Sequence, residues 1–347
     1  MNRLGHRPEL DGVRGLAIIL VVAGHCLGRY EGWAQRGVLG VDLFFVLSGF
    51  LITTLLVEEW NRDRSLNLRE FYVRRARRLL PALAFLVGVF AFLSLLALPS
   101  RAPETGLEAI LRISYVANFF IAFTENGVGV GFDHLWSLAQ EEQFYLLWPP
   151  VLFLSLRRRV SPGRLLLVVV VGIAAVNLQR LAVIGAGGER HRIWFAPDTH
   201  SDAILFGCAA ALLWKHRLLR LPASRWTWVV VGAVLLGAFV AFDPLEPSTF
   251  PATLPLFAAA SAVGIILLLD HSTAIAPRLF ATRPMQGMGK VSYGLYLWHA
   301  PLIAFFGIAG LPVAFGASVL SYFYVEKPFR RRSATKVAVP APVPAGR

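Results

Sequence analysis

Apolar stretches long enough to cross a lipid bilayer recur along almost the whole chain. A membrane helix needs about 20 consecutive residues that are mostly apolar. The sequence contains ten such stretches, two of which, 201–214 and 312–326, are short for a full crossing. The predicted spans are 12–28, 38–57, 79–98, 134–154, 165–184, 201–214, 226–242, 252–269, 291–309 and 312–326. The pattern predicts an all-α polytopic membrane bundle of about ten transmembrane helices.

An eleventh apolar stretch, 107–122, carries Glu108 and Arg112, so we predict a re-entrant or interfacial helix there. The basic residues support this choice. If the N-terminus is cytoplasmic and 107–122 does not cross, 27 of the 34 Lys and Arg residues lie in cytoplasmic segments and only six lie outside. Cytoplasmic loops of membrane proteins collect Lys and Arg, so both termini are predicted to be cytoplasmic.

The composition excludes the soluble classes of protein. Of 347 residues, 56% are hydrophobic and only 16% are charged, whereas soluble domains are about a quarter charged. The net charge of +13 is therefore interpreted as an orientation signal, and no nucleic-acid partner is expected. Cys26 and Cys208 both lie in predicted spans, which provides neither a disulfide framework nor a metal site. We interpret Cys26 as a packed apolar thiol.

The ends of the chain carry further expectations. The first span runs into Arg29–Tyr30–Glu31 without a small-residue cleavage pattern, so a retained signal-anchor is predicted. Residues 331–347 are basic and then rich in Pro and Ala, which predicts a disordered cytoplasmic tail. No internal repeat is visible, and this argues against an inverted-repeat transporter.

Ionisable residues inside predicted spans are functional candidates because charge is costly in a bilayer. Arg14 and His25 are 11 residues apart in the first span. This spacing places them on one helix face, roughly 16 Å apart along the axis. His25 is the candidate general base, and Arg14 is a fixed cation that holds an anionic cofactor or the helix bundle. The alternatives are an orientation-setting Arg14 and a packed, hydrogen-bonded His25.

Asp42 begins the second span, close to the predicted outer surface. It either complements the helix dipole or orients His25 or an acceptor hydroxyl. Ser48, which follows in the same span, is interpreted as a packing residue rather than a catalytic one.

Four arginines precede the third span at its cytoplasmic edge, and three or four residues separate several of them. Guanidinium groups bind phosphate bidentately, so the cluster suits a polyphosphate, with lipid headgroup binding as the alternative. The cluster consists of Arg74, Arg75, Arg77 and Arg78.

Glu141 and Glu142 lie inside an apolar run that also contains Trp136 and Tyr145. Acids among aromatic rings are typical of a sugar-binding surface, and pairing of one acid with an intramembrane arginine is the alternative. Two later spans add Asp202, near Asp198 and His200, and His299. A lone buried histidine such as His299 is more often a hydrogen-bonded packing residue than a catalyst.

Several of these motifs occur together in a known order, and in that order they resemble membrane acyltransferase family 3, the bacterial integral-membrane O-acyltransferases. The motifs cover residues 7–330 and read RPELDGVRGLAIILVVAGH, GVLGVDLFFVLSGFLIT, FYVRRARRLLP, LWSLAQEEQFYLLWP, PDTHSDAILFG, VSYGLYLWHAPL and YVEKPFR.

The resemblance implies transfer of an acyl group, usually acetyl from acetyl-CoA, to a hydroxyl of a carbohydrate or glycosylated product. The family's Arg and His, separated by ten residues, map onto Arg14 and His25. Its Arg-x-x-Arg motif maps onto Arg74 and Arg77, with an overlapping copy formed by Arg75 and Arg78, and its terminal acid maps onto Glu326. His200 stands where many relatives have Arg.

Some members of the family carry an appended periplasmic hydrolase-like domain that completes the transfer. Here only a 21-residue tail, 327–347, follows the last predicted span. Any second step is therefore expected to be absent or to be performed by another protein.

The sequence thus predicts an acyltransferase domain over 1–330 in the bacterial cytoplasmic membrane. Acyl-CoA is the expected donor substrate, with no permanently bound cofactor, and partners are the bilayer, a carbohydrate acceptor and polysaccharide-assembly proteins or a second copy. A transporter or flippase, or a non-catalytic scaffold, remains the alternative. The expected catalytic residues are His25, Asp42 and Glu142; donor-binding residues are Arg14, Arg74, Arg75, Arg77 and Arg78; acceptor-binding residues are Trp136, Glu141, Tyr145, Asp202 and His299.

Overall fold

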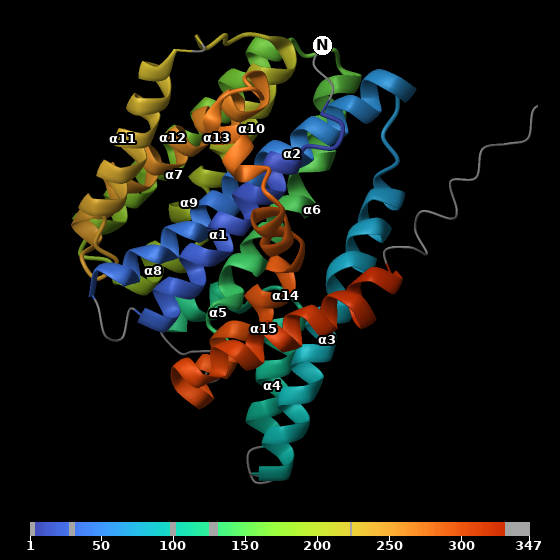
Figure 1. Cartoon of the computed structure of the whole chain (residues 1–347), viewed down its shortest axis with the longest axis vertical. Helices are drawn as coiled ribbons and strands as arrows, with labels where there is room; N and C mark the ends of the chain where they lie inside the picture. The colour runs from blue at the N-terminus through green and yellow to red at the C-terminus, as the bar shows by residue number, and fades with distance from the viewer. Residues whose placement is uncertain (1–3, 28–31, 98–101, 125–130, 223, 330–347) are drawn as a thin grey trace, which may run out of the picture.

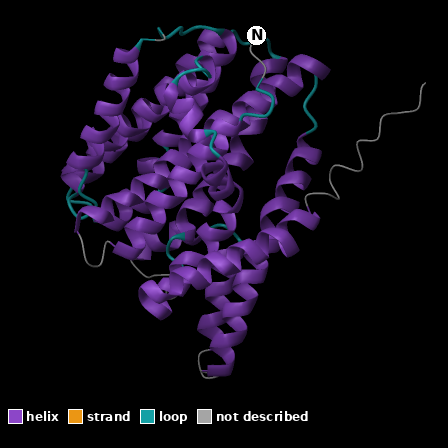
Figure 2. Ribbon diagram, in the orientation of Figure 1, coloured by secondary structure: helices purple, strands orange, loops and turns teal. Residues whose placement is uncertain are grey.

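A computed structural model describes residues 4–27, 32–97, 102–124, 131–222 and 224–329, and within these ranges every regular element is a helix (Figures 1 and 2). The predicted tail 331–347, and the predicted loop positions Arg29 and Arg101, lie outside the described residues. The elements are α1 (Pro8–Leu27), η1 (Gly32–Val38), α2 (Leu39–Asp63), α3 (Leu68–Ala97), α4 (Ala102–Ile113), α5 (Ala117–Thr124), α6 (Leu135–Arg157), α7 (Pro162–Gly185), α8 (Arg190–Phe195), α9 (Pro197–His200), α10 (Asp202–His216), α11 (Arg225–Ala241), η3 (Pro247–Thr249), α12 (Phe250–Asp270), α13 (Ile275–Phe280), α14 (Arg283–Phe306), η4 (Gly307–Ala309), α15 (Gly310–Leu320) and η5 (Ser321–Glu326).

Each of the ten predicted spans falls on one of these helices. Six helical segments of the described chain are long and apolar enough to cross a membrane. α10 and α11, with 15 and 17 residues, are shorter than a full crossing. The membrane-helical class is therefore confirmed, whereas the count of ten crossings and the side of the termini stay predictions. The six segments are Pro8–Leu27, Ala34–Asp63, Leu68–Leu96, Pro162–Gly185, Pro247–Asp270 and Arg283–Phe329.

The stretch 107–122 forms two helices, α4 and α5, which meet at an angle of 117°. This is the geometry of a re-entrant loop or a broken span, rather than of one straight crossing. Tyr115 lies at the break with a φ of 56°, in the left-handed region that side chains rarely adopt. Gln143 of α6 donates from Nε2 to the Tyr115 carbonyl oxygen at 2.8 Å, which holds the bend against the bundle.

Glycines bring α2 unusually close to α10. Gly49 of α2 lies against the Ile204 carbonyl oxygen, and Gly207 of α10 lies against the Val46 carbonyl oxygen. A Cβ at either glycine would collide with the facing backbone, so only a residue without a side chain fits. The backbone of α2 around residue 48 is consequently fixed against a neighbouring helix. Figure 1 shows α1 and α2 in the middle of the bundle, with α11 and α12 on one side and α3 on the other.

Candidate active site

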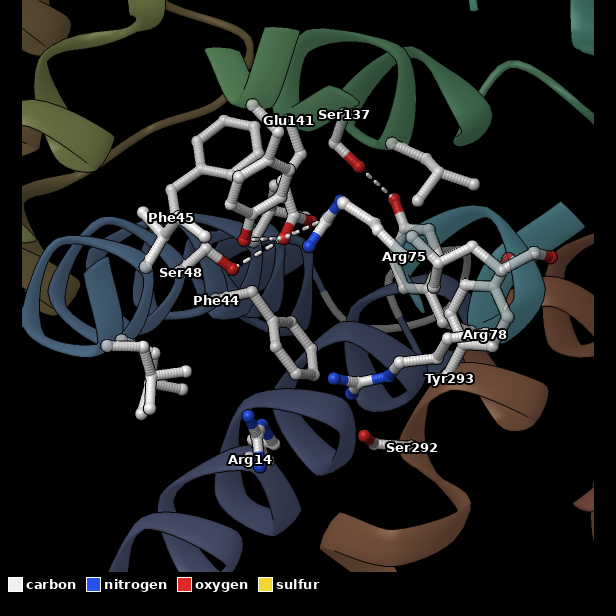
Figure 3. A pocket seen from close by; sticks show the side chains of 18 residues that line it. Arg14, Phe44, Phe45, Ser48, Arg75, Arg78, Ser137, Glu141, Ser292 and Tyr293 are labelled. Carbon is white, nitrogen blue, oxygen red and sulfur yellow. Dashed lines mark hydrogen bonds and ion pairs between the residues drawn. The ribbon is translucent and has the colours of Figure 1, made fainter. Parts of the chain in front are cut away.

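A narrow cavity of about 200 Å³ lies between α1, α2, α3, α6 and α14 (Figure 3). Its lining follows α2 from Val41 to Leu55, which corresponds to about 21 Å of helix. Pockets for drug-sized ligands hold about 300–1,000 Å³. The cavity therefore has room for a thin, extended chain and not for a whole nucleotide.

Three guanidinium groups line this cavity. Arg14 comes from α1, and Arg75 and Arg78 come from α3 (Figure 3). The Nη1 of Arg14 donates to Asp11 Oδ1 at 2.9 Å within the same helix. These groups concentrate positive charge on the cavity wall, where an anionic ligand would be favoured.

Two of the four arginines in the predicted cluster do not line the cavity. Arg74 is exposed and pairs with Glu70 at 2.6 Å and with Glu59 at 3.7 Å, away from the cavity. Arg77 is half-buried and does not line the cavity either. Only Arg75 and Arg78 of the predicted cluster therefore line the cavity, and the binding of a polyphosphate by all four arginines stays a prediction.

The guanidinium group of Arg75 contacts the carboxylate of Glu142 and the ring of Tyr145. Its Nε donates to both oxygens of Glu142, at 2.8 and 3.0 Å, and its Nη2 donates to Glu142 Oε1 at 2.6 Å. The guanidinium carbon lies 3.1 Å from the centroid of the Tyr145 ring. Glu142 thus neutralises an arginine between α3 and α6, so its expected role in orienting His25 is not supported.

Glu141 faces the cavity and accepts several hydrogen bonds on one oxygen. Its Oε1 accepts from Ser48 Oγ at 2.5 Å and from Tyr145 Oη at 2.6 Å, and Arg75 Nη2 lies 3.5 Å away. The sequence did not identify Ser48 as functional. Its partner Glu141 is 93 residues away in the chain, and no local pattern indicates that the two helix faces meet.

Three histidines gather in the bundle near one end of the cavity. The ring centroid of His299 lies 4.9 Å from that of His25 and 5.3 Å from that of His134. In all three, Nδ1 faces a backbone carbonyl oxygen, which for His25 is that of Val21 at 2.9 Å. Since a carbonyl oxygen only accepts, Nδ1 carries the proton in the neutral ring and Nε2 carries the lone pair.

Tyr296 connects the cavity to this histidine cluster. Its hydroxyl lines the cavity, forms a short hydrogen bond with Ser137, and donates to the His134 carbonyl oxygen at 2.6 Å. Its ring centroid lies 5.7 Å from that of His299. His134 is not among the candidates selected from the sequence. It directly precedes α6, and a histidine at the start of a predicted span is typical of the membrane interface.

A family model described as an acyltransferase domain matches residues 7–325 of the chain. The chain belongs to this acyltransferase family. Among similar proteins, the peptidoglycan O-acetyltransferase OatA of Listeria monocytogenes is 32% identical over 93% of the chain. The putative peptidoglycan O-acetyltransferase YrhL of Bacillus subtilis is 33% identical over 93%, and the O-acetyltransferase OatA of Staphylococcus aureus is 31% identical over 94%.

The chain spans little more than half the length of these relatives, between 55% and 57% of each. No solved structure matches the chain.

Asp42 of this acyltransferase domain is buried and contacts His200. His200 Nε2 lies 3.1 Å from Asp42 Oδ1, and both side chains are fully buried. The His200 ring stacks on Trp136, with ring centroids 5.3 Å apart and ring planes inclined by 21°. Asp42, Trp136 and His200 thus pack together at a junction of α2, α6 and α9, and the catalytic role of Asp42 and the acceptor contact of Trp136 stay predictions.

Asp202 also forms an internal pair. Its Oδ1 accepts from Arg180 Nη2 at 2.6 Å, and its Oδ2 accepts from Asn177 Nδ2 at 3.2 Å. Arg180 and Asp202 are 0% and 1% exposed, which leaves no room for a sugar. The expectation of an acceptor contact at Asp202 is therefore replaced by a buried ion pair between α7 and α10.

The remaining candidates lie at the edges of the site. Glu326 ends the π-helical element η5, and its Oε1 faces Gly294 of α14. Cys26 and Cys208 are buried and neither lines the cavity. Among the described residues, no group of three or more His, Cys, Asp or Glu is arranged to hold a metal ion.

Proposed function

We propose that this acyltransferase domain moves an acetyl group from acetyl-CoA to a hydroxyl of a carbohydrate in the bacterial cytoplasmic membrane. The observation that carries the proposal is a single cavity that begins among guanidinium groups and ends at the Tyr296–Ser137 hydrogen bond beside three histidines. Cations suit the phosphates of the donor, and an imidazole suits proton transfer from the acceptor.

The donor fits the dimensions of the cavity. The nucleotide stays outside, because about 200 Å³ does not hold it, and its phosphates meet Arg78 and Arg14. The thin pantetheine arm then extends along α2, whose lining covers about 21 Å of helix from Leu55 to Val41. This assignment uses the predicted orientation, in which the arginines of α3 are at the cytoplasmic side.

His25 is the general base for the acceptor hydroxyl. The hydrogen bond from Nδ1 to the Val21 carbonyl oxygen fixes the ring so that Nε2 is the basic atom. His299 packs edge-on against the ring at 4.9 Å and keeps its orientation. Proton abstraction by a positioned side chain contributes about 10²–10⁴-fold to a rate.

The acceptor is proposed to be a glycan of the peptidoglycan type, since OatA of Listeria monocytogenes is a peptidoglycan O-acetyltransferase and YrhL of Bacillus subtilis is a putative one. The domain over 1–330 would supply the acetyl transfer in the membrane.

The experiment uses the purified full chain in lipid nanodiscs, with acetyl-CoA labelled in the acetyl group and soluble peptidoglycan fragments. We expect acceptor-dependent release of the CoA thiol and an alkali-labile acetyl ester on the glycan. A His25→Gln chain, matched in preparation, serves as the inactive control. Glycan that stays unlabelled while the folded wild-type chain binds acetyl-CoA would contradict the proposal.

A further inference from the structure

Two of the described cavity hydroxyls differ from the others in what they contact. Most cavity hydroxyls donate to backbone carbonyl oxygens: Ser292 to Gly289, Tyr293 to Leu79 and Tyr296 to His134. The Ser137 hydroxyl donates to the same His134 carbonyl oxygen at 3.3 Å and is hydrogen-bonded to the Tyr296 hydroxyl. Only Ser48 and Tyr145, among the described residues that line the cavity, donate to a carboxylate.

Ser48 is the more accessible of these two. Tyr145 is only 4% exposed, and the guanidinium group of Arg75 covers its ring at 3.1 Å. Ser48 is half-buried, and its side chain faces the cavity from the middle of the α2 wall (Figure 3). A substrate in the cavity therefore reaches the Ser48 hydroxyl without displacing a side chain that covers it.

The surroundings of Ser48 have the arrangement of an activated nucleophile. Its Oγ lies 2.5 Å from Glu141 Oε1, and the same carboxylate is oriented by Tyr145 Oη at 2.6 Å. A nucleophile, a base within hydrogen-bond reach and a third group that orients the base form the general pattern of covalent catalysis. Arg75 Nη2 lies 3.5 Å from Glu141 Oε1 and so contacts the same carboxylate oxygen.

The backbone that carries Ser48 is also fixed. The preceding turn contributes the Val46 carbonyl oxygen to the contact with Gly207, and Gly49 lies directly against the backbone of α10. Neither contact tolerates a Cβ, so α2 cannot slide along α10 without opening this interface. Such anchoring holds a reacting side chain within the small positional range that catalysis requires.

We propose that Ser48 carries the acetyl group as a covalent ester between donor and acceptor, with Glu141 as its base; this inference rests on the proposed function. Ser48 Oγ attacks the thioester carbonyl carbon and its proton passes to Glu141. The carbon–sulfur bond breaks, the CoA thiolate leaves and takes a proton from water, and Glu141 keeps the proton of Ser48. The acceptor hydroxyl then gives its proton to His25 and attacks the ester carbonyl carbon. The bond from Oγ to the carbonyl carbon breaks, Ser48 Oγ takes the proton back from Glu141, and His25 releases its proton to water.

The test incubates the purified full chain with labelled acetyl-CoA in the absence of acceptor. After an acid quench, we expect label on the protein and one added acetyl group on the α2 peptide that contains Ser48. Ser48→Ala should lose this label, whereas Ser155→Ala, which removes an α6 hydroxyl outside the cavity lining that donates to the Val151 carbonyl oxygen, should keep it. Ser48→Cys should form a thioester instead, recognised by its release with neutral hydroxylamine.

Equal labelling of wild type and Ser48→Ala would overturn the proposal, as would a Ser48→Ala chain that transfers acetyl to glycan at the wild-type rate. Elution of each variant as a single species in detergent controls for folding. Wild-type chain that acetylates glycan but never carries label overturns the Ser48 step alone. Wild-type chain that neither carries label nor acetylates glycan overturns both this step and the proposed function.

Discussion

Arg74 and Arg78 lie one helical turn apart on α3 and differ in what they face. Arg78 lines the cavity, whereas Arg74 is exposed and pairs with Glu70. Arg78→Ala should raise the KM for acetyl-CoA by about tenfold or more, because a hydrogen bond to a charged group contributes about 1.5–3 kcal/mol. Arg74→Ala, the matched control, should change KM by less than about fivefold, as expected for a surface ion pair.

These KM values are measured from the rate of thiol release at varied acetyl-CoA concentrations. Equal effects of the two substitutions would contradict the division of the arginine cluster and would favour a joint polyphosphate site.

His25 permits a prediction that separates chemistry from binding. His25→Gln keeps a side chain of similar size but removes the basic nitrogen, so kcat should fall by about 10²–10⁴-fold. The affinity for acetyl-CoA, measured by titration of the labelled donor, should stay within about threefold of wild type, because His25 does not line the cavity. A loss of binding with unchanged kcat would assign His25 to the donor site instead.

At the scale of elements, two neighbouring ion pairs differ in burial and so predict different stabilities. Arg180–Asp202 joins α7 to α10 with both side chains fully buried, whereas the Asp198 side chain of the Arg192–Asp198 pair is 48% exposed. Asp202→Ala should lower the free energy of unfolding by about 3–5 kcal/mol, because it leaves a buried guanidinium unpaired. Asp198→Ala should cost less than about 1 kcal/mol.

Thermal unfolding of the detergent-purified chains measures this contrast. The double variant Arg180→Ala with Asp202→Ala should recover part of the loss, because it removes the uncompensated charge. Equal shifts of the unfolding temperature by Asp202→Ala and Asp198→Ala would contradict the expectation that burial makes the loss of an ion pair more costly.

The helices also show which parts of the site the sequence could anticipate. From the sequence, pairing of Glu141 or Glu142 with an arginine is the alternative to sugar binding. Arg75 and Glu142 form such a pair in the structure. The contacts of Asp42 and Asp202 were not anticipated, because their partners His200 and Arg180 come from other helices. Hydropathy locates a helix, but the partner of each polar side chain depends on how two helices cross.

At the scale of the whole molecule, the charge distribution predicts the orientation of the chain. With Cys26 and Cys208 replaced by Ala, a single Arg158→Cys should react with a membrane-impermeant maleimide only in inverted vesicles. A single Ala186→Cys, at the other end of α7, should react in intact cells whose outer surface is accessible. The expectation follows from the excess of Lys and Arg in the predicted cytoplasmic segments. The reverse pattern would contradict the predicted orientation.

The sequence by itself determined the membrane-helical class, the positions of the helices and the acyltransferase family, because apolar runs and ordered motifs are local properties of a chain. Only the tertiary structure decided which polar groups meet: Ser48 with Glu141, Asp42 with His200, and His25 with His299. These contacts join residues 93, 158 and 274 positions apart. Such pairings depend on the rotation and crossing of packed helices, which glycine contacts such as those of Gly49 and Gly207 fix only in the folded bundle.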